Sequence, residues 1–228
     1  MGNGDRAQRP TREEAQIGRA HYLAGGVLVL AALAACAWVY PHLPARIPTR
    51  FGITGQPEQF GPREMVFAIG PGLMACTLVL FALIDRFAAR ALGVASFRKT
   101  YLELMLISVA MTGYFAACVV VGSLRPGFDT ARALFAGAGL LFVLGGNLMG
   151  RVKRNWVFGI RLPWTLAGDA VWNATQRFAA RAMVLAGLVA IGAALAGAPP
   201  WSVAAVLFIA PLASGAYGAW VALRRHRS

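Results

Sequence analysis

Six long apolar segments constrain the fold of this chain more than any other feature of its sequence. Each is close to the ~20 residues that an α-helix needs to cross the hydrocarbon core of a membrane. A backbone inside lipid must satisfy its own hydrogen bonds, so each segment is predicted to be a helix. The sequence therefore predicts an all-α, polytopic integral membrane protein with six transmembrane helices. They are expected at residues 22–40, 65–84, 101–121, 131–150, 182–198 and 201–222.

The distribution of positive charge predicts how these helices are oriented. The formal net charge is +13, but the basic residues gather in the tails and in alternate connections. Cytoplasmic connections carry the excess of Lys and Arg in membrane proteins, so both termini are predicted to be cytoplasmic. The basic residues would then face anionic lipid headgroups. No basic stripe with interleaved aromatic residues indicates nucleic-acid binding. Of the 22 Lys and Arg residues, the connections predicted to lie outside contain Arg46, Arg50, Arg63, Arg125 and Arg132.

The connections divide the chain into a membrane domain and two tails. Residues 1–21 are a polar N-terminal tail, expected to be loose or an interfacial helix. Residues 22–222 are the six-helix membrane domain, and residues 223–228 are a basic cytoplasmic tail. Two connections are long: an outside loop rich in Pro and Gly at 41–64, and an inside elbow at 151–181. These two connections are where specific function is expected.

Ionisable residues inside the apolar segments are few, which disfavours an ion-coupled transporter. Glu103 lies one helical turn after Lys99, so an i,i+4 pair could hold it at the membrane interface. A buried functional carboxylate is the alternative for Glu103. Asp85 and Arg132 lie at segment ends, where their side chains can reach the surface.

Nothing in the sequence predicts an enzyme. Metalloprotease, esterase, phosphate-loop and dinucleotide-binding motifs are absent, and the three cysteines lack metal-ligand spacing. No cofactor or metal is therefore predicted. Leu33-Ala34-Ala35-Cys36 resembles a lipoprotein cleavage site, but the apolar segment continues through Val39, so the chain is expected to remain unprocessed and without lipid.

Within the inside elbow, the segment Asn155–Leu166, NWVFGIRLPWTL, breaks the apolar pattern. Tryptophans in such a segment favour the headgroup level. Thr165 is predicted to cap a helix with Asp169 in its first turn. Val171, Trp172, Thr175 and Phe178 share one face of that helix, which is expected to lie on the inner surface before the fifth span.

Arg161 is expected to lie at membrane depth, where an unpaired guanidinium is costly. It is predicted to pair with Asp169, Asn155 or a backbone carbonyl freed by Pro163. A simple lipid anchor is the alternative for this elbow, although its polar residues exceed what an anchor needs.

Two sets of residues carry a resemblance to a known family. Asn147, Lys153, Asn155, Gly159-Ile160-Arg161, Pro163-Trp164-Thr165-Leu166, Val171-Trp172, Thr175 and Arg177 resemble the signature of the SdpI family of bacterial membrane immunity proteins. Leu43-Pro44, Ile47-Pro48, Phe51-Gly52, Gly55 and Pro57-Glu58 are similar to an element that often precedes this signature. The chain departs from the family pattern at Arg50 and Gln176, where His is usual, at Arg154, where Pro is common, and at Glu58, where Asp is frequent. No role of a family histidine is carried over.

The resemblance implies a multi-pass protein of the bacterial cytoplasmic membrane that protects against a membrane-active peptide toxin. In some members it also implies signal transduction to a cytoplasmic regulator. The alternative is a small membrane transporter or peptide exporter. The predicted toxin contacts in the outside loop are Pro44, Ile47, Pro48, Phe51, Gly55, Pro57 and Glu58. The residues predicted to contact a regulator or to gate the helices are Asn155, Trp156, Gly159, Arg161, Pro163, Trp164, Thr165, Asp169, Trp172, Thr175 and Arg177.

Overall fold

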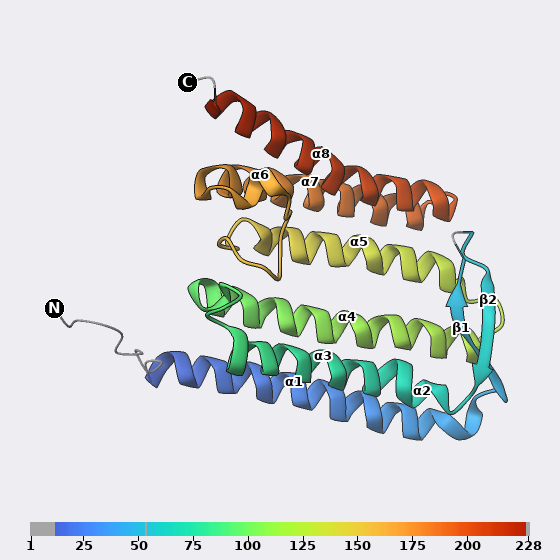
Figure 1. Cartoon of the computed structure of the whole chain (residues 1–228). Coiled ribbons are helices and arrows are strands. Elements are labelled where there is room, and N and C mark those ends of the chain that lie inside the picture. Colours follow the sequence, from blue (N-terminus) through green and yellow to red (C-terminus); the bar gives the residue numbers. More distant parts are fainter. Residues whose placement is uncertain (1–11, 53, 227–228) are drawn as a thin grey trace.

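The computed structural model describes residues 12–52 and 54–226 of this chain, whose long helices lie side by side with roughly aligned axes (Figure 1). The N-terminal half contains α1 (Arg12–Val39), the turn η1 (Tyr40–His42), β1 (Arg46–Phe51), β2 (Pro57–Pro62), α2 (Met65–Phe67), the π-helical turn η2 (Ala68–Gly72), α3 (Leu73–Leu83), the π-helical turn η3 (Ile84–Ala88) and the 3₁₀ turn η4 (Val94–Phe97). The C-terminal half contains α4 (Arg98–Leu124), α5 (Thr130–Met149), α6 (Pro163–Leu166), α7 (Asp169–Leu195) and α8 (Pro200–His226).

The prediction of six spanning helices is confirmed. Six helices among the described residues are long and apolar enough to cross a membrane. The second combines α2, η2 and α3 with η3, and the third combines η4 with α4. The six extend over Gln16–His42, Met65–Ala88, Val94–Leu124, Thr130–Met149, Asp169–Leu195 and Pro200–Arg225.

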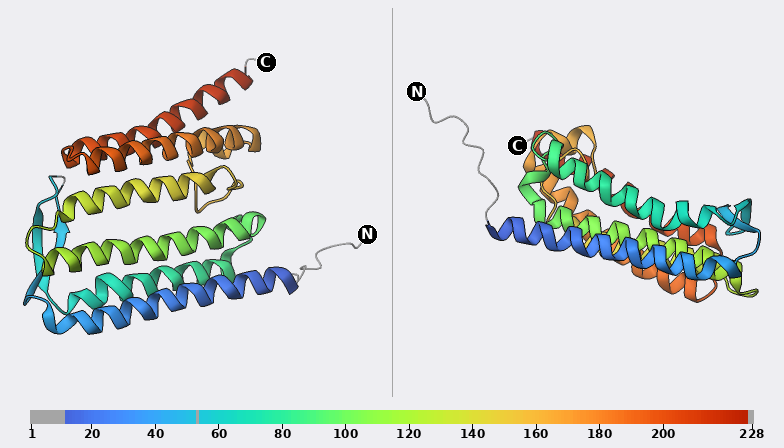
Figure 2. Two further views of the ribbon diagram at one scale, coloured as in Figure 1. Left: turned by 180° about the vertical axis from the view of Figure 1, so that it is seen from behind. Right: turned by 90° about the horizontal axis from the view of Figure 1, so that it is seen from below.

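The helices are arranged in order across the bundle. Both α1 and α3 contact α4, which contacts α5; α5 packs on α7, and α7 packs on α8 (Figures 1 and 2). The β1–β2 hairpin crosses one end of the bundle, which we call the hairpin end. The α3–α4 and α5–α7 connections, the start of α1 and the end of α8 lie at the opposite end. Segments predicted to share one side of the membrane thus lie together, while the side that each end faces stays a prediction.

Three features differ from the sequence prediction. The fifth span begins at Asp169, so the predicted surface helix over 169–181 is wrong: this stretch is the first half of α7. The helix is unbroken from Asp169 to Leu195. Its polar residues Thr175 and Gln176 are buried against protein. Residues 12–21 of the predicted tail belong to α1, and 1–11 lie outside the described residues. The basic tail continues α8 to His226, and 227–228 are outside the described residues.

The third difference is a β-hairpin inside the outside loop. β1 and β2 pair antiparallel, with Ile47 opposite Gly61 and Pro48 opposite Phe60. Ile47 is fully buried against Leu43 and Val66, so the hairpin is anchored on the helices below it. Proline hides strand patterns in a sequence because it cannot donate to a ladder, and both strands contain it.

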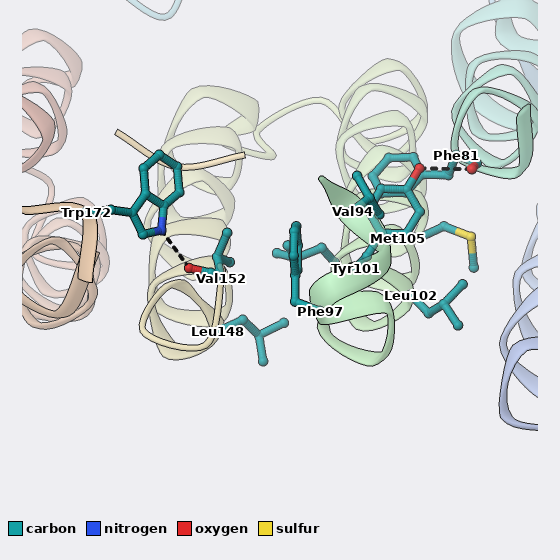
Figure 3. Close-up of a cluster of buried hydrophobic side chains, with 10 residues drawn as sticks. Phe81, Val94, Phe97, Tyr101, Leu102, Met105, Leu148, Val152 and Trp172 are labelled. Atoms are coloured by element: carbon teal, nitrogen blue, oxygen red, sulfur yellow. Dashed lines mark hydrogen bonds between the residues drawn. The ribbon is translucent and has the colours of Figure 1, made fainter. Parts of the chain in front are cut away.

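The largest buried cluster joins the two halves of the bundle near the opposite end (Figure 3). Tyr101 of α4 is fully buried, and its hydroxyl donates to the carbonyl of Phe81 at 2.9 Å. Trp172 of α7 is fully buried, and its indole N–H donates to the carbonyl of Val152 at 2.9 Å. Each polar atom of these large side chains therefore has a partner inside the apolar cluster.

The backbones of helices α5 and α7 approach each other closely at Gly139 and Gly187. A Cβ built on Gly187 would lie 2.5 Å from the carbonyl oxygen of Gly139, and one on Gly139 would lie 2.8 Å from that of Gly187. Small residues at such a crossing let the two backbones pack directly.

We expect Gly187→Ala to destabilise the protein by about 1–3 kcal/mol, because the added methyl group must push backbone rather than a flexible side chain. Gly192→Ala, in the same helix, is the control: a Cβ there meets nothing within 4 Å. Thermal unfolding of both variants in detergent measures the difference. Equal melting temperatures would contradict the packing described.

Candidate functional site

The connection between α5 and α7, residues 150–168, is ordered around Asn155. Its Oδ1 accepts hydrogen bonds from the N–H groups of Val157 (2.6 Å) and Phe158 (2.7 Å). Its Nδ2 donates to the carbonyls of Lys153 (2.7 Å) and Phe158 (3.0 Å). A side-chain amide has two donor hydrogens and two acceptor lone pairs, so every hydrogen-bonding position is used. Asn155 is 2% exposed and acts as an internal brace for the turn.

Gln176 attaches this connection to α7. Its Oε1 accepts from the N–H of Ile160 at 3.1 Å, and its Nε2 donates to the carbonyl of Ile160 at 3.2 Å. The backbone comes this close at Gly159, which has a φ of +108°. A Cβ on Gly159 would lie 3.0 Å from both Gln176 Oε1 and a ring carbon of Trp172. The glycine of the signature is therefore needed for its conformation and for space.

Gln176 was not among the predicted site residues, although its departure from the usual His was noted. The sequence signal for Gln176 is that it is a polar residue, next to Thr175, in an otherwise apolar helix. The sequence could not name its partner, because Ile160 offers only backbone groups.

Thr165 does not cap α7, so that prediction is wrong. It lies within α6 and is fully buried, and its hydroxyl accepts from the N–H of Leu162 at 2.9 Å and donates to the carbonyl of Ile160 at 2.8 Å. Its oxygen is therefore used to close α6 itself. Gly168 precedes α7 instead, and Asp169 lies in the first turn as expected.

The three tryptophans of this region have different environments. Trp156 is 60% exposed, which suits the predicted interfacial position, and its backbone N–H donates to the carbonyl of Leu92 at 2.9 Å. Trp164 is partly exposed, and its indole N–H donates to the carbonyl of Gly215 in α8 at 3.3 Å. Trp156 and Trp164 therefore connect the segment to the α3–α4 connection and to α8, and the hydrogen bond from Trp172 to Val152 connects it to α7.

Arg161 is exposed on the surface of the protein, and its depth in the membrane stays a prediction. Its guanidinium donates to the carbonyl of Trp156, not to Asp169 or Asn155. Asp169 pairs instead with Arg154 at 2.9 Å, and both side chains are largely exposed. Asn155 has no capacity left for Arg161, and Asp169 lies beyond α6. Arg177 is exposed on α7. These charges contribute little to stability, because exposed ion pairs are worth roughly 0–1 kcal/mol.

Two ion pairs at the opposite end were not predicted. Arg98 donates to both carboxylate oxygens of Asp85, at 2.8 and 2.7 Å, and the hydroxyl of Tyr22 donates to Asp85 at 3.0 Å. Asp85 is nearly buried, so it joins α1, η3 and α4 rather than reaching the surface. Glu103 pairs loosely with Arg151 at 3.7 Å, so the predicted partner Lys99 is wrong. Sequence spacing finds partners along one helix and misses those supplied by another.

The hairpin presents its own charges at the other end. Arg50 and Glu58 lie on opposite strands and pair at 3.5 Å. Hydrogen bonds from its own backbone N–H and from the Tyr40 hydroxyl, with Arg63 nearby, lower the pKa of the Glu64 carboxyl below its ordinary value. The Glu64 carboxyl is therefore ionised at neutral pH.

A cavity of about 490 Å³ lies between the hairpin and the turn that joins α4 to α5. Apolar side chains of both strands line one wall, and the start of α5 lines the other. At the hairpin turn, Gly55 lies against Ala131 of α5 and Pro200 of α8. A half-open cavity whose lining mixes apolar and polar side chains can hold side chains of a peptide. Its walls include Pro44, Arg46, Pro48, Phe51, Gly55, Gln56, Pro57, Phe60, Phe128 and Asp129.

The structure separates the two predicted sets of site residues to opposite ends of the bundle. Five of the outside set, Pro44, Pro48, Phe51, Gly55 and Pro57, line the cavity. Ile47 is buried in the anchor below it, and Glu58 pairs with Arg50. In the inside set, Asn155, Thr165, Trp172 and Thr175 are buried, while Trp156, Arg161, Asp169 and Arg177 are exposed. Pro163 begins α6, and Phe60, Phe128 and Asp129 are cavity residues that the sequence did not single out.

An N-terminal and a C-terminal part of this chain each resemble a known protein family. The model of the SdpI/YfhL protein family matches residues 151–218, which contain the α5–α7 connection, α7 and most of α8. A domain of unknown function (DUF1648) matches residues 27–75, which contain the hairpin. The first match contains the residues of the inside signature except Asn147. The second match contains all the residues of the similar element in the outside loop.

Two relatives extend the comparison. The Immunity protein SdpI of Bacillus subtilis is 23% identical over 151 residues, which are 66% of this chain and 70% of that protein. An uncharacterized protein of Archaeoglobus fulgidus is 38% identical over 65 residues, 23% of this chain and 36% of that protein. No solved structure matches the chain. With its six long apolar helices the chain is a multi-pass membrane protein, and its α5–α7 connection, α7 and most of α8 are similar to the SdpI/YfhL protein family.

Proposed function

We propose that this protein protects the bacterial cell that makes it against a membrane-active peptide toxin. The observation that carries the proposal is the similarity to the Immunity protein SdpI over 66% of the chain. The proposed role needs a binding surface and no catalytic group. The part of the chain that the structure describes contains no cluster of His, Cys, Asp and Glu able to hold a metal ion.

The cavity under the hairpin is the proposed toxin contact. The prolines and phenylalanines in its lining suit the apolar side chains of a peptide that partitions into membranes, and Arg46 and Asp129 add charge to the lining. The hairpin is held by Ile47 below and by the contact of Gly55 with α5 and α8, so it offers a preformed surface. A preformed surface binds more tightly because less entropy is lost on binding.

The α5–α7 connection is proposed to couple the helices or to meet a cytoplasmic regulator. It contacts α7 through Gln176 and α8 through Trp164, so any movement of these helices changes its shape. Its exposed face carries Trp156, Arg161 and Asp169, which are available to a protein partner. Both this role and the cytoplasmic position of the termini follow from the proposed orientation.

Toxin challenge tests the proposal. Cells that lack the gene should be killed by peptides secreted by the same or neighbouring strains, at concentrations that cells with the gene survive. Phe60→Ala should lower the tolerated concentration about tenfold, because an aromatic contact in a binding pocket commonly contributes more than about 1 kcal/mol. Phe87→Ala, another exposed phenylalanine far from the cavity, should leave protection unchanged at equal expression. Equal sensitivity with and without the gene would sink the proposal, and export of the peptide would indicate a transporter instead.

Cysteine labelling tests the orientation. In a variant without the three native cysteines, Gln56→Cys at the hairpin end should react with a membrane-impermeant maleimide on intact cells. Trp156→Cys, exposed at the opposite end, should react only after the cells are opened. The reverse pattern would place the hairpin in the cytoplasm and remove it as a toxin contact.

A further inference from the structure

A second cavity, of about 300 Å³, lies at the opposite end between α1, the start of α4 and the α5–α7 connection. Its charged lining residues are Arg98, Lys99, Arg151 and Lys153, and no Asp or Glu of the described residues lines it. Ile17 and Leu102 form an apolar part of the wall. The four cations come from two segments about fifty positions apart, so the tertiary structure concentrates them here.

The charge in this cavity is only partly neutralised by carboxylates. Arg98 is paired with Asp85 through two hydrogen bonds. Arg151 has only the 3.7 Å contact with Glu103. Among the described side chains, no carboxylate lies within ion-pair distance of Lys99 or Lys153, and both are exposed. The cavity therefore presents at least the charges of Lys99 and Lys153 to an anion.

We propose that this cavity binds a phosphate-bearing anion, and that the anion is the headgroup of an anionic phospholipid. Lysine and arginine bind phosphate through charge-assisted hydrogen bonds, and the hydroxyl-bearing residues Ser96 and Thr100 also line the cavity. The site lies at the ends of the spanning helices α1 and α4, where lipid headgroups reside. The partly exposed side chain of Ile17 in the wall suits the glycerol and upper acyl chain better than a free ion.

A bound headgroup would bridge the two halves of the bundle. Lys99 belongs to α4, whereas Lys153 belongs to the connection that Asn155 orders and Gln176 attaches to α7. A phosphate between these cations would stabilise that contact, as any ligand stabilises the state that binds it. This inference does not depend on the proposed immunity function.

Binding of short-chain phosphatidylglycerol to the full-length protein in neutral detergent tests the inference. We expect saturable binding with a rise in melting temperature, and no comparable effect of short-chain phosphatidylcholine. Lys99→Gln/Lys153→Gln should weaken binding about 30-fold, because each basic residue near an anionic lipid contributes roughly a factor of five. Neither lysine has a carboxylate partner among the described residues, so the double variant should fold.

Arg86→Gln/Arg181→Gln is the matched control, since both arginines are exposed and lie outside the cavity. Equal loss of phosphatidylglycerol binding in both double variants would overturn the proposal, because it would reveal only general attraction to a basic surface. Unchanged binding in the lysine variant would also overturn it. Inorganic phosphate distinguishes the sources: weak or absent competition supports the lipid, whereas competition at equal concentration supports the phosphate site and overturns its assignment to lipid.

Discussion

Replacing Trp172 with alanine is expected to destabilise the protein by about 3–5 kcal/mol, the usual cost of removing a buried aromatic side chain. Trp172 is fully buried in the cluster that joins α4, α5 and α7, and its indole N–H satisfies the carbonyl of Val152. Removal leaves both a cavity and an unpaired carbonyl. Thermal unfolding in detergent, followed by tryptophan fluorescence or circular dichroism, measures the loss.

Two further variants show where the energy comes from. Trp172→Phe keeps most of the volume and loses the hydrogen bond, so it should cost about 1–3 kcal/mol. Trp201→Ala removes an exposed tryptophan at the start of α8 and should change stability little. If Trp172→Ala melts at the same temperature as Trp201→Ala, the cluster does not hold the two halves together.

Asn155→Ala is expected to cost about 2–5 kcal/mol and to loosen the α5–α7 connection. The substitution leaves two N–H groups and two carbonyls without their partner, and buried groups without partners cost about 1–3 kcal/mol each before water re-enters. Partial hydration of the loosened segment keeps the total below the sum. Asn155→Asp keeps the acceptor but places a carboxylate oxygen against the carbonyls of Lys153 and Phe158, so it should cost at least as much as alanine.

Asn173→Ala is the control for this effect. Asn173 lies on α7 and makes no side-chain hydrogen bond among the described residues, and alanine favours the helix. In Asn155→Ala the connection should be cut faster by protease and the melting temperature should fall. In Asn173→Ala neither quantity should change. Equal protease resistance of the two variants would show that Asn155 does not order the connection.

The position of the signature can now be explained in physical terms. Gly159 and Ile160 are where the connection approaches α7, and Trp172 and Thr175 are buried against it. Arg161 and Asp169, which seemed the most specific residues from their charge, are exposed and pair locally. The connection is held by the uncharged side-chain amides of Asn155 and Gln176 and not by its charged residues.

The sequence by itself determined the six helices and the grouping of their connections into two ends. These depend on the length of each apolar run and on the placement of basic residues, which are local properties that lipid selects directly. The position of Asn155 and Gly159 in a specific connection was also predictable from their signature.

Only the tertiary structure decided the hairpin, the start of the fifth span and the ion pairs. The strands contain Pro48, Pro57 and Pro62, which conceal their pairing. Ile47 is buried because α1, α2 and the end of α4 lie beneath it. The first half of α7 is predicted as a surface helix because Val171, Trp172, Thr175 and Phe178 share one face. In the structure its polar residues Thr175 and Gln176 are both buried. They are buried because the α5–α7 connection and α8 cover that face, and no local pattern contains the residues that cover it.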